Sequence, residues 1–332
     1  MSGRSILERR VTLTAAALLG ALASVVALPA AADAAPSYRI IDLNVGDNSS
    51  ANAVNEQGHV VGDREGRPFL WRNGQATLLL PDGEFGRAED ANNRDEVVGN
   101  RFVNGASHGF LWRRGVVTDL GVLPGGDNSF ASAINDHGEI VGWSATAPNN
   151  GDLHAFRWRD GTMTDLGVPP EPFSQSIARD INNAGQIAGD MNRGGMDLFA
   201  VRWDRGGAVR TLSTQSMGMA INDLGDVTGL TLSGGALAHG YVWHRSALTE
   251  IPTPQIGFMP FLQPYGINNR VQVVGDTNLG AFLWQRGQLT TLPSLTHGGT
   301  AYDINNRGVI VGTSASQEGM APHYHAVMWL RT

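Results

Sequence analysis

The stretch INDHGEIVGW, residues 134–143, decides the fold of this chain, because its pattern returns about every 40 residues. It predicts two short strands joined by a tight turn. The asparagine opens the turn by accepting a hydrogen bond from the backbone two residues on, and the glycine three residues later takes the left-handed conformation. A second glycine, seven residues after the asparagine, indicates a bulge or a close approach of two backbones. The repeated pairs are Asn55 and Gly62, Asn92 and Gly99, Asn135 and Gly142, Asn182 and Gly189, Asn222 and Gly229, Asn268 and Gly275, and Asn305 and Gly312.

The third unit serves as a template for all seven. Its alternating apolar residues predict strands over Phe130–Asn135, Glu139–Trp143, His154–Trp158 and Thr162–Leu166, and Asp160-Gly161 is a hairpin signal between the last two. Every unit carries a tryptophan on its third strand. These are Trp71, Trp112, Trp158, Trp203, Trp243, Trp284 and Trp329.

Two tight turns in each unit require antiparallel neighbours, which argues against a parallel β-helix. Four short antiparallel strands in a unit of about 42 residues match one blade of a β-propeller. Small residues on the first strand, such as Ala131 and Ala133, suit a crowded hub. The third-strand tryptophans are expected to fill the gaps between blades. We therefore predict an all-β fold, a seven-bladed β-propeller of four-stranded antiparallel blades.

The ends of the chain predict how the ring closes. The seventh unit stops at Thr332, directly after its third strand. The segment Tyr38–Leu43 precedes the first unit and resembles a fourth strand such as Val117–Leu120. We expect the propeller to be closed by this N-terminal strand pairing with the last blade, which leaves no exposed sheet edge.

Two turns depart from the pattern. Asp95 replaces the turn glycine of the second unit, and aspartate tolerates the left-handed conformation. Val271 replaces it in the sixth unit, where a β-branched residue would be strained. We expect a different turn in the sixth unit.

The first residues predict export. Arg4, Arg9 and Arg10 precede an apolar run from Val11 to Leu28 and an alanine-rich exit, as in a secretory signal peptide. The predicted organisation is a signal peptide over 1–34, cleaved after Ala34, and a single propeller domain over 35–332. The protein is then secreted, periplasmic or on the cell surface, by the general or the twin-arginine route.

Composition excludes several functions. The formal net charge is −7, whereas binding to a nucleic-acid backbone needs a basic surface. The chain has no lysine, which excludes Schiff-base chemistry and a phosphate-loop lysine. It has no cysteine, so burial and strand pairing must hold the fold. Nucleophile-elbow, zinc-protease and calcium-hand patterns are absent, so an enzyme is the less favoured class, and we expect no cofactor.

The triplet His-Ala-Phe at 154–156, together with Asp-Leu-Gly at 165–167, resembles the repeat of an extracellular family named for that triplet. Close variants begin at His108, His239 and His325. The resemblance covers essentially all of the chain after the N-terminal segment. It implies export and a repeated β fold, but no established activity or catalytic residues.

Most conspicuous polar residues have a structural explanation. Turn capping accounts for the seven asparagines. The strand histidines sit at equivalent places in different blades and cannot converge within about 2 Å of one metal ion, so we expect them to make structural hydrogen bonds. Fourth-strand acids such as Asp119 and Asp165 would lie on outer edge strands, where charge discourages pairing with another sheet. No metal site is predicted.

Function is expected at the end of the blades opposite the tight turns, here called the long-loop face. Its connections vary in length over a fixed scaffold, which is where recognition usually sits. Trp143 stands out there because no other unit has an aromatic residue at that position. It could stack on a ligand, but local packing under the loop Ser144–Asp152 is the favoured alternative. The candidate ligand contacts are Asp127, Asn128, Phe130, Trp143 and His297.

These features favour an exported monomeric binding module that uses the long-loop face around the central opening for an extracellular protein or a carbohydrate. Such a module predicts an apolar or aromatic patch at the opening. One alternative is an extracellular hydrolase or lyase with a central-pocket active site, which predicts clustered carboxylates or histidines of perturbed pKa. A structural envelope protein is the second alternative and predicts neither feature, together with self-association.

Overall fold

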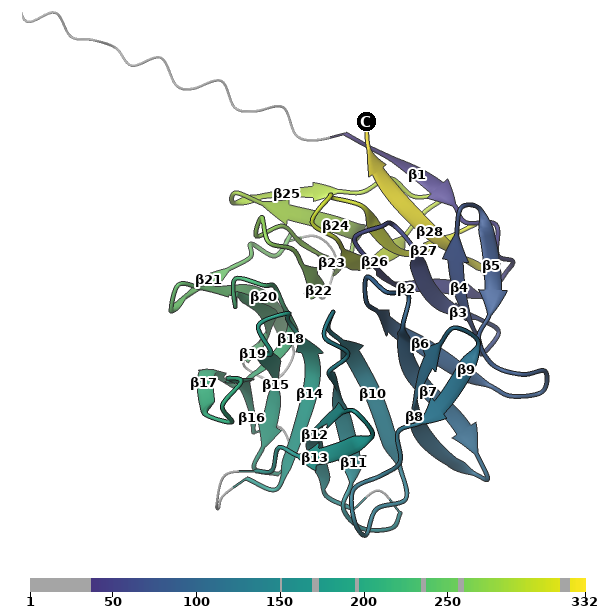
Figure 1. Cartoon of the computed structure of the whole chain (residues 1–332). Helices are drawn as coiled ribbons and strands as arrows, with labels where there is room; N and C mark the ends of the chain where they lie inside the picture. Colours follow the sequence, from purple (N-terminus) through teal and green to yellow (C-terminus); the bar gives the residue numbers. More distant parts are fainter. Residues whose placement is uncertain are drawn as a thin grey trace, which may run out of the picture. The chain divides into compact units, whose positions relative to one another are not determined.

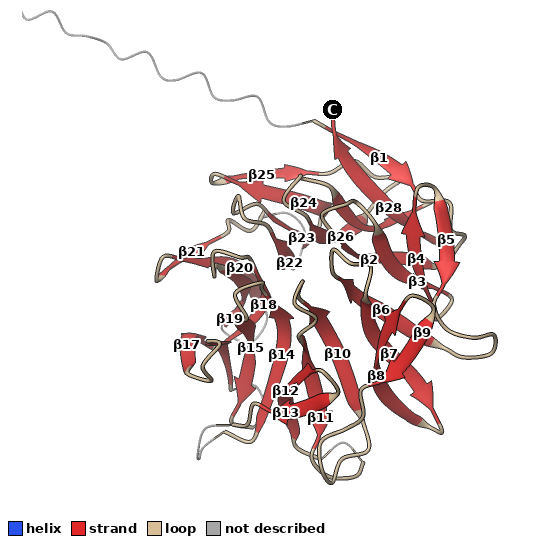
Figure 2. Ribbon diagram, in the orientation of Figure 1, coloured by secondary structure: helices blue, strands red, loops and turns tan. Residues whose placement is uncertain are grey.

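The computed structural model describes residues 37–149, 151–168, 173–194, 197–233, 237–255, 260–316 and 323–332. The predicted signal peptide and its cleavage site lie outside these residues. The span Pro36–Thr332 forms one compact unit, a ring of sheets around a central axis (Figure 1). The regular elements of the described residues are 28 β-strands (Figure 2). None of the described residues belongs to a helix long and apolar enough to cross a membrane.

The strands form seven four-stranded antiparallel sheets, numbered here as blades 1 to 7. In blades 1 to 6, the four strands follow one another in sequence order, with the first strand innermost and the fourth outermost (Figure 1). In blade 7, the outermost strand is β1, from the N-terminal end of the domain. The predicted all-β, seven-bladed propeller is therefore confirmed. Blade 1 is β2 (Ser49–Val54), β3 (Val60–Arg64), β4 (Arg67–Arg72) and β5 (Gln75–Leu78). Blade 2 is β6 (Gly86–Ala91), β7 (Val97–Val103), β8 (Ala106–Arg113) and β9 (Val116–Asp119).

The other blades repeat this order. Blade 3 is β10 (Ser129–Ile134), β11 (Ile140–Ala145), β12 (Leu153–Arg159) and β13 (Thr162–Asp165). Blade 4 is β14 (Gln175–Ile181), β15 (Ile187–Asn192), β16 (Leu198–Trp203) and β17 (Val209–Thr214). Blade 5 is β18 (Ser216–Ile221), β19 (Val227–Ser233), β20 (Leu237–His244) and β21 (Ala247–Glu250). Blade 6 is β22 (Leu262–Ile267), β23 (Val273–Thr277), β24 (Gly280–Gln285) and β25 (Gln288–Thr291). Blade 7 is β26 (Gly299–Ile304), β27 (Ile310–Ala315), β28 (Tyr324–Arg331) and the N-terminal β1 (Tyr38–Asp42).

Ring closure follows the prediction from the chain ends. β1 pairs antiparallel with β28, from Tyr38 opposite Arg331 to Asp42 opposite Val327. The backbone amide of Leu43 extends the pairing to the carbonyl of Ala326 at 3.0 Å. Figure 1 shows β1 alongside β28 at the outer side of blade 7. The first and last strands of the domain thus share one sheet.

The second repeated glycine lies opposite a bulge in the first strand. In blade 3, Ala131 pairs with Gly142 and the register then shifts before Ala133, and every blade repeats this shift. A Cβ on these seven glycines would stand only 1.8–2.0 Å from a carbonyl oxygen of the first strand. The predicted close approach of backbones is confirmed, and any side chain would push the two strands apart.

Hydrophobic burial occurs between blades. The described residues form seven apolar clusters, each drawn from two neighbouring blades, and one third-strand tryptophan belongs to or packs against each cluster. Trp203 and Trp329 are 1% and 0% exposed. The tryptophans therefore fill the gaps between blades as expected, which removes a large apolar area from water at each interface.

The expectation for the sixth turn is wrong. Val271 adopts the left-handed conformation with a φ of 56°, and its amide donates to the carbonyl of Asn268 at 3.0 Å, as in the other blades. The turn keeps its form because Asn268 and the two strands it joins are held by the same contacts as elsewhere. Val271 packs against the apolar cluster of blades 5 and 6, which offsets part of the backbone strain.

Candidate functional site

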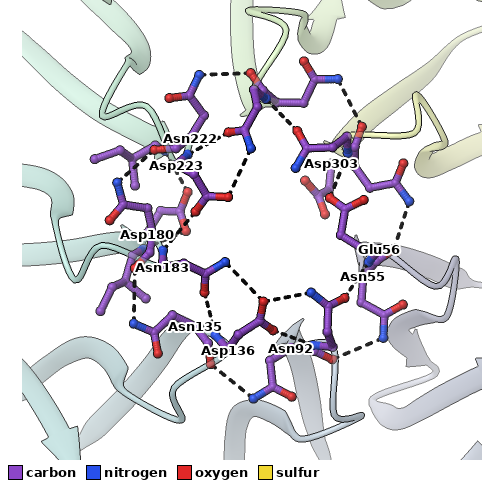
Figure 3. Close-up of a pocket in the computed structure, with 18 of the residues that line it drawn as sticks. Asn55, Glu56, Asn92, Asn135, Asp136, Asp180, Asn183, Asn222, Asp223 and Asp303 are labelled. Carbon is purple, nitrogen blue, oxygen red and sulfur yellow. Dashed lines mark hydrogen bonds between the residues drawn. The ribbon is translucent and has the colours of Figure 1, made fainter.

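The tight-turn end of the central channel is a closed ring of asparagines, here called the hub ring: Asn55, Asn92, Asn135, Asn182, Asn222, Asn268 and Asn305 (Figure 3). Each side-chain amide donates to the backbone carbonyl of the hub asparagine in the next blade, at 2.9–3.2 Å. The last of these bonds runs from Asn305 back to Asn55. In six blades the side-chain oxygen also accepts the predicted bond from the amide two residues on. The hub asparagines therefore cap their own turns and also join all seven blades.

The residues that follow the hub asparagines form a second closed ring, here called the rim ring: Glu56, Asn93, Asp136, Asn183, Asp223, Asn269 and Asn306. Each backbone amide of this ring donates to the side-chain oxygen of the rim residue in the next blade, at 2.7–3.0 Å. Every rim residue is Asn, Asp or Glu, because the position requires a side-chain oxygen as acceptor. The two rings surround a polar cavity of about 180 Å³.

Three buried aspartates form a third layer, deeper in the channel. Asp90, Asp180 and Asp303 sit two residues before the hub asparagine in blades 2, 4 and 7. One oxygen of each accepts from the next amide of its own strand at 2.7 Å. The other accepts from an amide of the following blade, at 2.7–2.9 Å. These carboxyls therefore bridge blades 2 to 3, 4 to 5, and 7 to 1.

Burial strongly perturbs these three carboxyls. It raises the pKa of Asp90 to about 8, against the lowering effect of the Ile134 amide. It raises the pKa of Asp180 and of Asp303 to about 6. The negative charges of Asp180 and Asp303 contribute to the raised pKa of Asp90. Because both oxygens of each carboxyl already accept backbone hydrogen bonds, joining blades accounts for these residues without a catalytic role.

A second axial cavity, of about 140 Å³, lies on the other side of the aspartates, toward the long-loop face. It is here called the long-loop cavity. The residues three before the hub asparagine line it, and they differ from blade to blade: Asn52, Glu89, Ser132, Arg179, Met219, Tyr265 and Tyr302. Asp90, Asp180 and Asp303 form its inner end. The two cavities thus share one axis but differ in whether their lining is repeated.

The long-loop cavity combines an aromatic wall with a buried acid. The rings of Tyr265 and Tyr302 meet edge to face, with their centres 5.4 Å apart. The Oε1 atom of Glu89 is buried and has no hydrogen-bond partner within the described structure. Burial raises the pKa of Glu89 in spite of Arg87, whose Nε lies 3.6 Å away. The one cation that lines the cavity, Arg179, is held by Asp190 at 2.5 Å. An acid whose buried Oε1 has an ion-pair partner but no hydrogen-bond donor therefore lines a cavity with an aromatic wall.

Two more buried acceptors without partners lie at the same end of the blades, on second strands. They are Oδ1 of Asn100 and Oδ1 of Asp276. Burial raises the pKa of Asp276 to about 6. Among the unpartnered buried side-chain atoms of the described residues, every oxygen lies on this side of the channel, while the nitrogens belong to outer tryptophans and arginines. Such acceptors are costly to bury and favour a ligand that brings hydrogen-bond donors.

The structure brings four of the five predicted ligand contacts together. Phe130 and Trp143, paired across β10 and β11, stack with ring centres 5.7 Å apart and planes 2° apart. Asp127 accepts from the amide of Asn149 at 2.8 Å, and Asn128 accepts from the amide of Ser107 at 2.8 Å. These two polar residues hold loops in place. His297 is exposed on the connection between blades 6 and 7, away from blade 3. The axial cavities are lined by other residues.

The histidine and acid repeats are explained by hydrogen bonds between strands. His108 contacts Asp119 at 3.0 Å and His154 contacts Asp165 at 2.8 Å, which confirms the structural role expected of these histidines. The acids also accept from a glycine amide two residues on. The sequence alone predicted that these acids discourage pairing at an outer edge strand. The structure shows that they also bond to a histidine and to a backbone amide. No group of three His, Asp or Glu within the described ranges is arranged to hold a metal ion.

The long-loop cavity was missed because its lining is not repeated. Its residues share one place on the first strand, where the seven units carry six different residue types that vary in size and charge. The available signal was the position three residues before the hub asparagine, which varies inside an otherwise regular repeat. The three bridging aspartates were missed for the same reason, since four other blades carry alanine or glycine at their position.

No protein-family model matches this chain, and no curated protein matches it significantly. Solved structures do. A puromycin hydrolase variant bound to PGG has a TM-score of 0.60 at 14% identity, covering 86% of this chain and 52% of its own. The Pyrococcus horikoshii acylaminoacyl peptidase gives 0.51 at 13%, covering 74% and 45%. TolB from Acinetobacter baumannii gives 0.44 at 16%, covering 61% and 51%. The chain thus matches about half the length of each, and the likeness to the puromycin hydrolase and the peptidase shows a propeller fold alone.

Proposed function

We propose that this protein is an exported binding module that takes a polyhydroxylated ligand of the carbohydrate class in the long-loop cavity. The observation that carries the proposal is that Glu89, whose buried oxygen has no hydrogen-bond donor, lines the same cavity as the Tyr265–Tyr302 pair. Hydroxyl groups would supply the missing donors, and aromatic rings pack against the apolar faces of sugars. The stacked Phe130 and Trp143 lie on blade 3, outside the lining of this cavity.

The proposal follows from the contrast between the two cavities. In the tight-turn cavity the repeated asparagines and rim residues are bonded to one another in closed rings. In the long-loop cavity the lining varies, and one buried acceptor has no hydrogen-bond donor. Variable residues over a fixed scaffold are what recognition of one particular ligand requires. A hydrolase or lyase is not proposed, because the buried aspartates on the axis are occupied by backbone amides.

A glycan array followed by calorimetry on the hits tests this function. Glu89→Gln and Tyr302→Ala should each weaken binding of a hit by about tenfold, through loss of a charged acceptor and of an aromatic wall. Glu250→Gln is the matched control, because it removes one exposed carboxylate from β21 without touching the axis. A hit that Glu89→Gln and Tyr302→Ala leave unchanged would place the ligand elsewhere. An array without any hit would contradict a carbohydrate ligand.

Export is part of the same proposal and rests on the basic, apolar and alanine-rich order of residues 1–35. Mass spectrometry of protein recovered outside the cytoplasm should give a chain that begins at Ala35. A chain that retains its first 34 residues there, or protein found only in the cytoplasm, would contradict a cleaved signal peptide.

A further inference from the structure

A groove between blades 4 and 5 is lined by two arginines that no carboxylate of the described residues pairs with. It encloses about 390 Å³ near the tight-turn end, between the β18–β19 turn, the β20–β21 turn and the strands β16 and β17. Trp243 forms its floor, with the guanidinium carbons of Arg202 and Arg210 at 5.2 and 5.1 Å from the ring centre. Leu224 stands at its edge and is 65% exposed. The groove therefore joins an apolar surface to a basic one.

Two arginines of this groove are left without an acid. Arg202 is satisfied by Asp204, at 3.0 Å, and Asp226 is taken by His244, at 2.7 Å. Arg210 and Arg245 have no carboxylate within ion-pair distance among the described residues, and both are exposed. A chain with a formal net charge of −7 therefore presents two unpaired cations side by side with an apolar edge. Arginine pairs well with carboxylates because its planar fork matches their geometry.

The hairpin turn beside the groove departs from the repeat and carries backbone strain. Ser246 has a φ of 69°, whereas the corresponding residues Gly74, Gly115, Gly161 and Gly287 are glycines. A non-glycine residue in this conformation costs about 1 kcal/mol or more, and such strain is often found at functional sites. The Ser246 hydroxyl accepts a hydrogen bond from Arg210 at 3.5 Å, so the departure adds a polar group to the groove.

We propose that this groove, defined by Arg202, Arg210, Leu224, Trp243, Arg245 and Ser246, docks an acidic and apolar peptide segment of a partner protein. A carboxylate binds between Arg210 and Arg245, and a neighbouring apolar side chain packs on Leu224 and Trp243. A nucleic acid is a poorer match, since two free cations cannot offset repulsion from an acidic protein. This site is independent of the long-loop cavity, which lies on the axis at the other end of the blades.

Three pools of ten-residue peptides test the site. Each pool has mixed apolar residues around two fixed positions, which are Glu in the first pool, Gln in the second and Lys in the third. Fluorescence anisotropy should show the Glu pool binding at least about tenfold tighter than the Gln pool, and more weakly as salt rises. Equal binding of the Glu and Gln pools, or no binding of the Glu pool, would overturn the proposal.

Matched variants locate the binding. The double variant Arg210→Glu, Arg245→Glu should reduce affinity for the Glu pool by at least about tenfold, because it places like charges against the peptide. Arg114→Glu is the control, since Arg114 holds the same turn position in blade 2 with the same φ of 49° as Arg245. Equal loss in the control would overturn the assignment to this groove. Thermal melting confirms that each variant is folded. Sedimentation measures whether the protein forms dimers. Dimers that the double variant abolishes would overturn the proposal, since the groove would then bind a second copy of this chain and not a partner peptide.

Discussion

The two ends of the central channel are made by the same seven strands in opposite ways. At the tight-turn end, the hub ring repeats one residue seven times, and each asparagine is bonded to the next blade. Three residues earlier on the same strands, the long-loop cavity is lined by side chains of six different types, one of which has a buried oxygen without a hydrogen-bond donor. Closing a ring requires the same contact in every blade, whereas binding a ligand does not. Repetition therefore marks what holds the fold, and its absence marks where function can differ.

The largest effect should come from opening the ring. Removing Ser37–Leu43 deletes β1 and exposes the edge of β28, together with the apolar surface that Leu43 and Ile40 cover. We expect loss of cooperative folding, because two of the seven blade interfaces then lose apolar residues that cover them. The measurement is thermal melting by circular dichroism. An unchanged melting temperature would show that ring closure does not depend on β1.

The next effect separates the two ends directly. Asn135→Ala removes the bond to the Asn182 carbonyl and leaves the amides of His137 and Glu139 without their acceptor. The expected loss of unfolding free energy is about 3 kcal/mol, since buried groups left unsatisfied cost about 1–3 kcal/mol each. Urea denaturation measures it.

Ser132→Ala is the control for the hub variant. Ser132 lies three residues earlier on β10, in the long-loop cavity, and should cost less than about 0.5 kcal/mol. Equal losses for the two variants would mean that the repeated and the variable positions hold the fold alike.

The bridging aspartates predict a pH dependence. Burial raises the pKa of Asp90 to about 8 and of Asp180 and Asp303 to about 6, from 3.8. Between about pH 4 and 8 the folded protein therefore binds more protons than the unfolded chain, so stability falls as pH rises. Asp42 and Asp47 raise the pKa of His325 at the seam, and this contribution too is lost as pH rises.

Melting temperatures at constant ionic strength should then decrease by several degrees from pH 5.5 to pH 8. This decrease corresponds to a loss of unfolding free energy on the order of 1–2 kcal/mol. Asp90→Asn should make the melting temperature depend less on pH, because it removes the carboxyl whose pKa is raised most. A melting temperature that increases over the range would contradict proton uptake by the aspartates. Below about pH 4 the trend should reverse, as Asp119 and Glu96, whose pKa values are lowered by hydrogen bonds and nearby arginines or histidine, become protonated.

The smallest expected effect concerns an imperfect copy of the repeat. Val271→Gly relieves the left-handed strain of the blade 6 turn, at the cost of some apolar packing and of chain entropy. We expect a net stabilisation of about 0.5–1 kcal/mol, measured as a shift of the denaturation midpoint. The control is Gly138→Val, which places the same residue in the blade 3 turn and should destabilise. Loss of stability in Val271→Gly would mean that packing outweighs strain.

The sequence by itself determined the architecture of this protein. The spacing of Asn135, Gly138 and Gly142, repeated seven times, requires a tight antiparallel turn and a close strand pair in each unit, and seven such units close into a propeller. The missing fourth strand after Trp329 predicted the seam with β1. These inferences succeeded because turn geometry and strand alternation are local, and local patterns are readable from residue order.

Only the tertiary structure decided which side chains meet on the axis. Each blade contributes a short run of residues there, from points about 40 residues apart, so no local pattern joins Asp90 to Ile134, or Tyr265 to Tyr302. The surroundings then set the chemistry of each residue. Burial raises the pKa of Asp90 within the channel, whereas a hydrogen bond from His323 lowers the pKa of the exposed Asp47. Position around a ring and distance from water are properties of the folded assembly of blades, and they decide whether a polar residue closes the ring or remains free for a ligand.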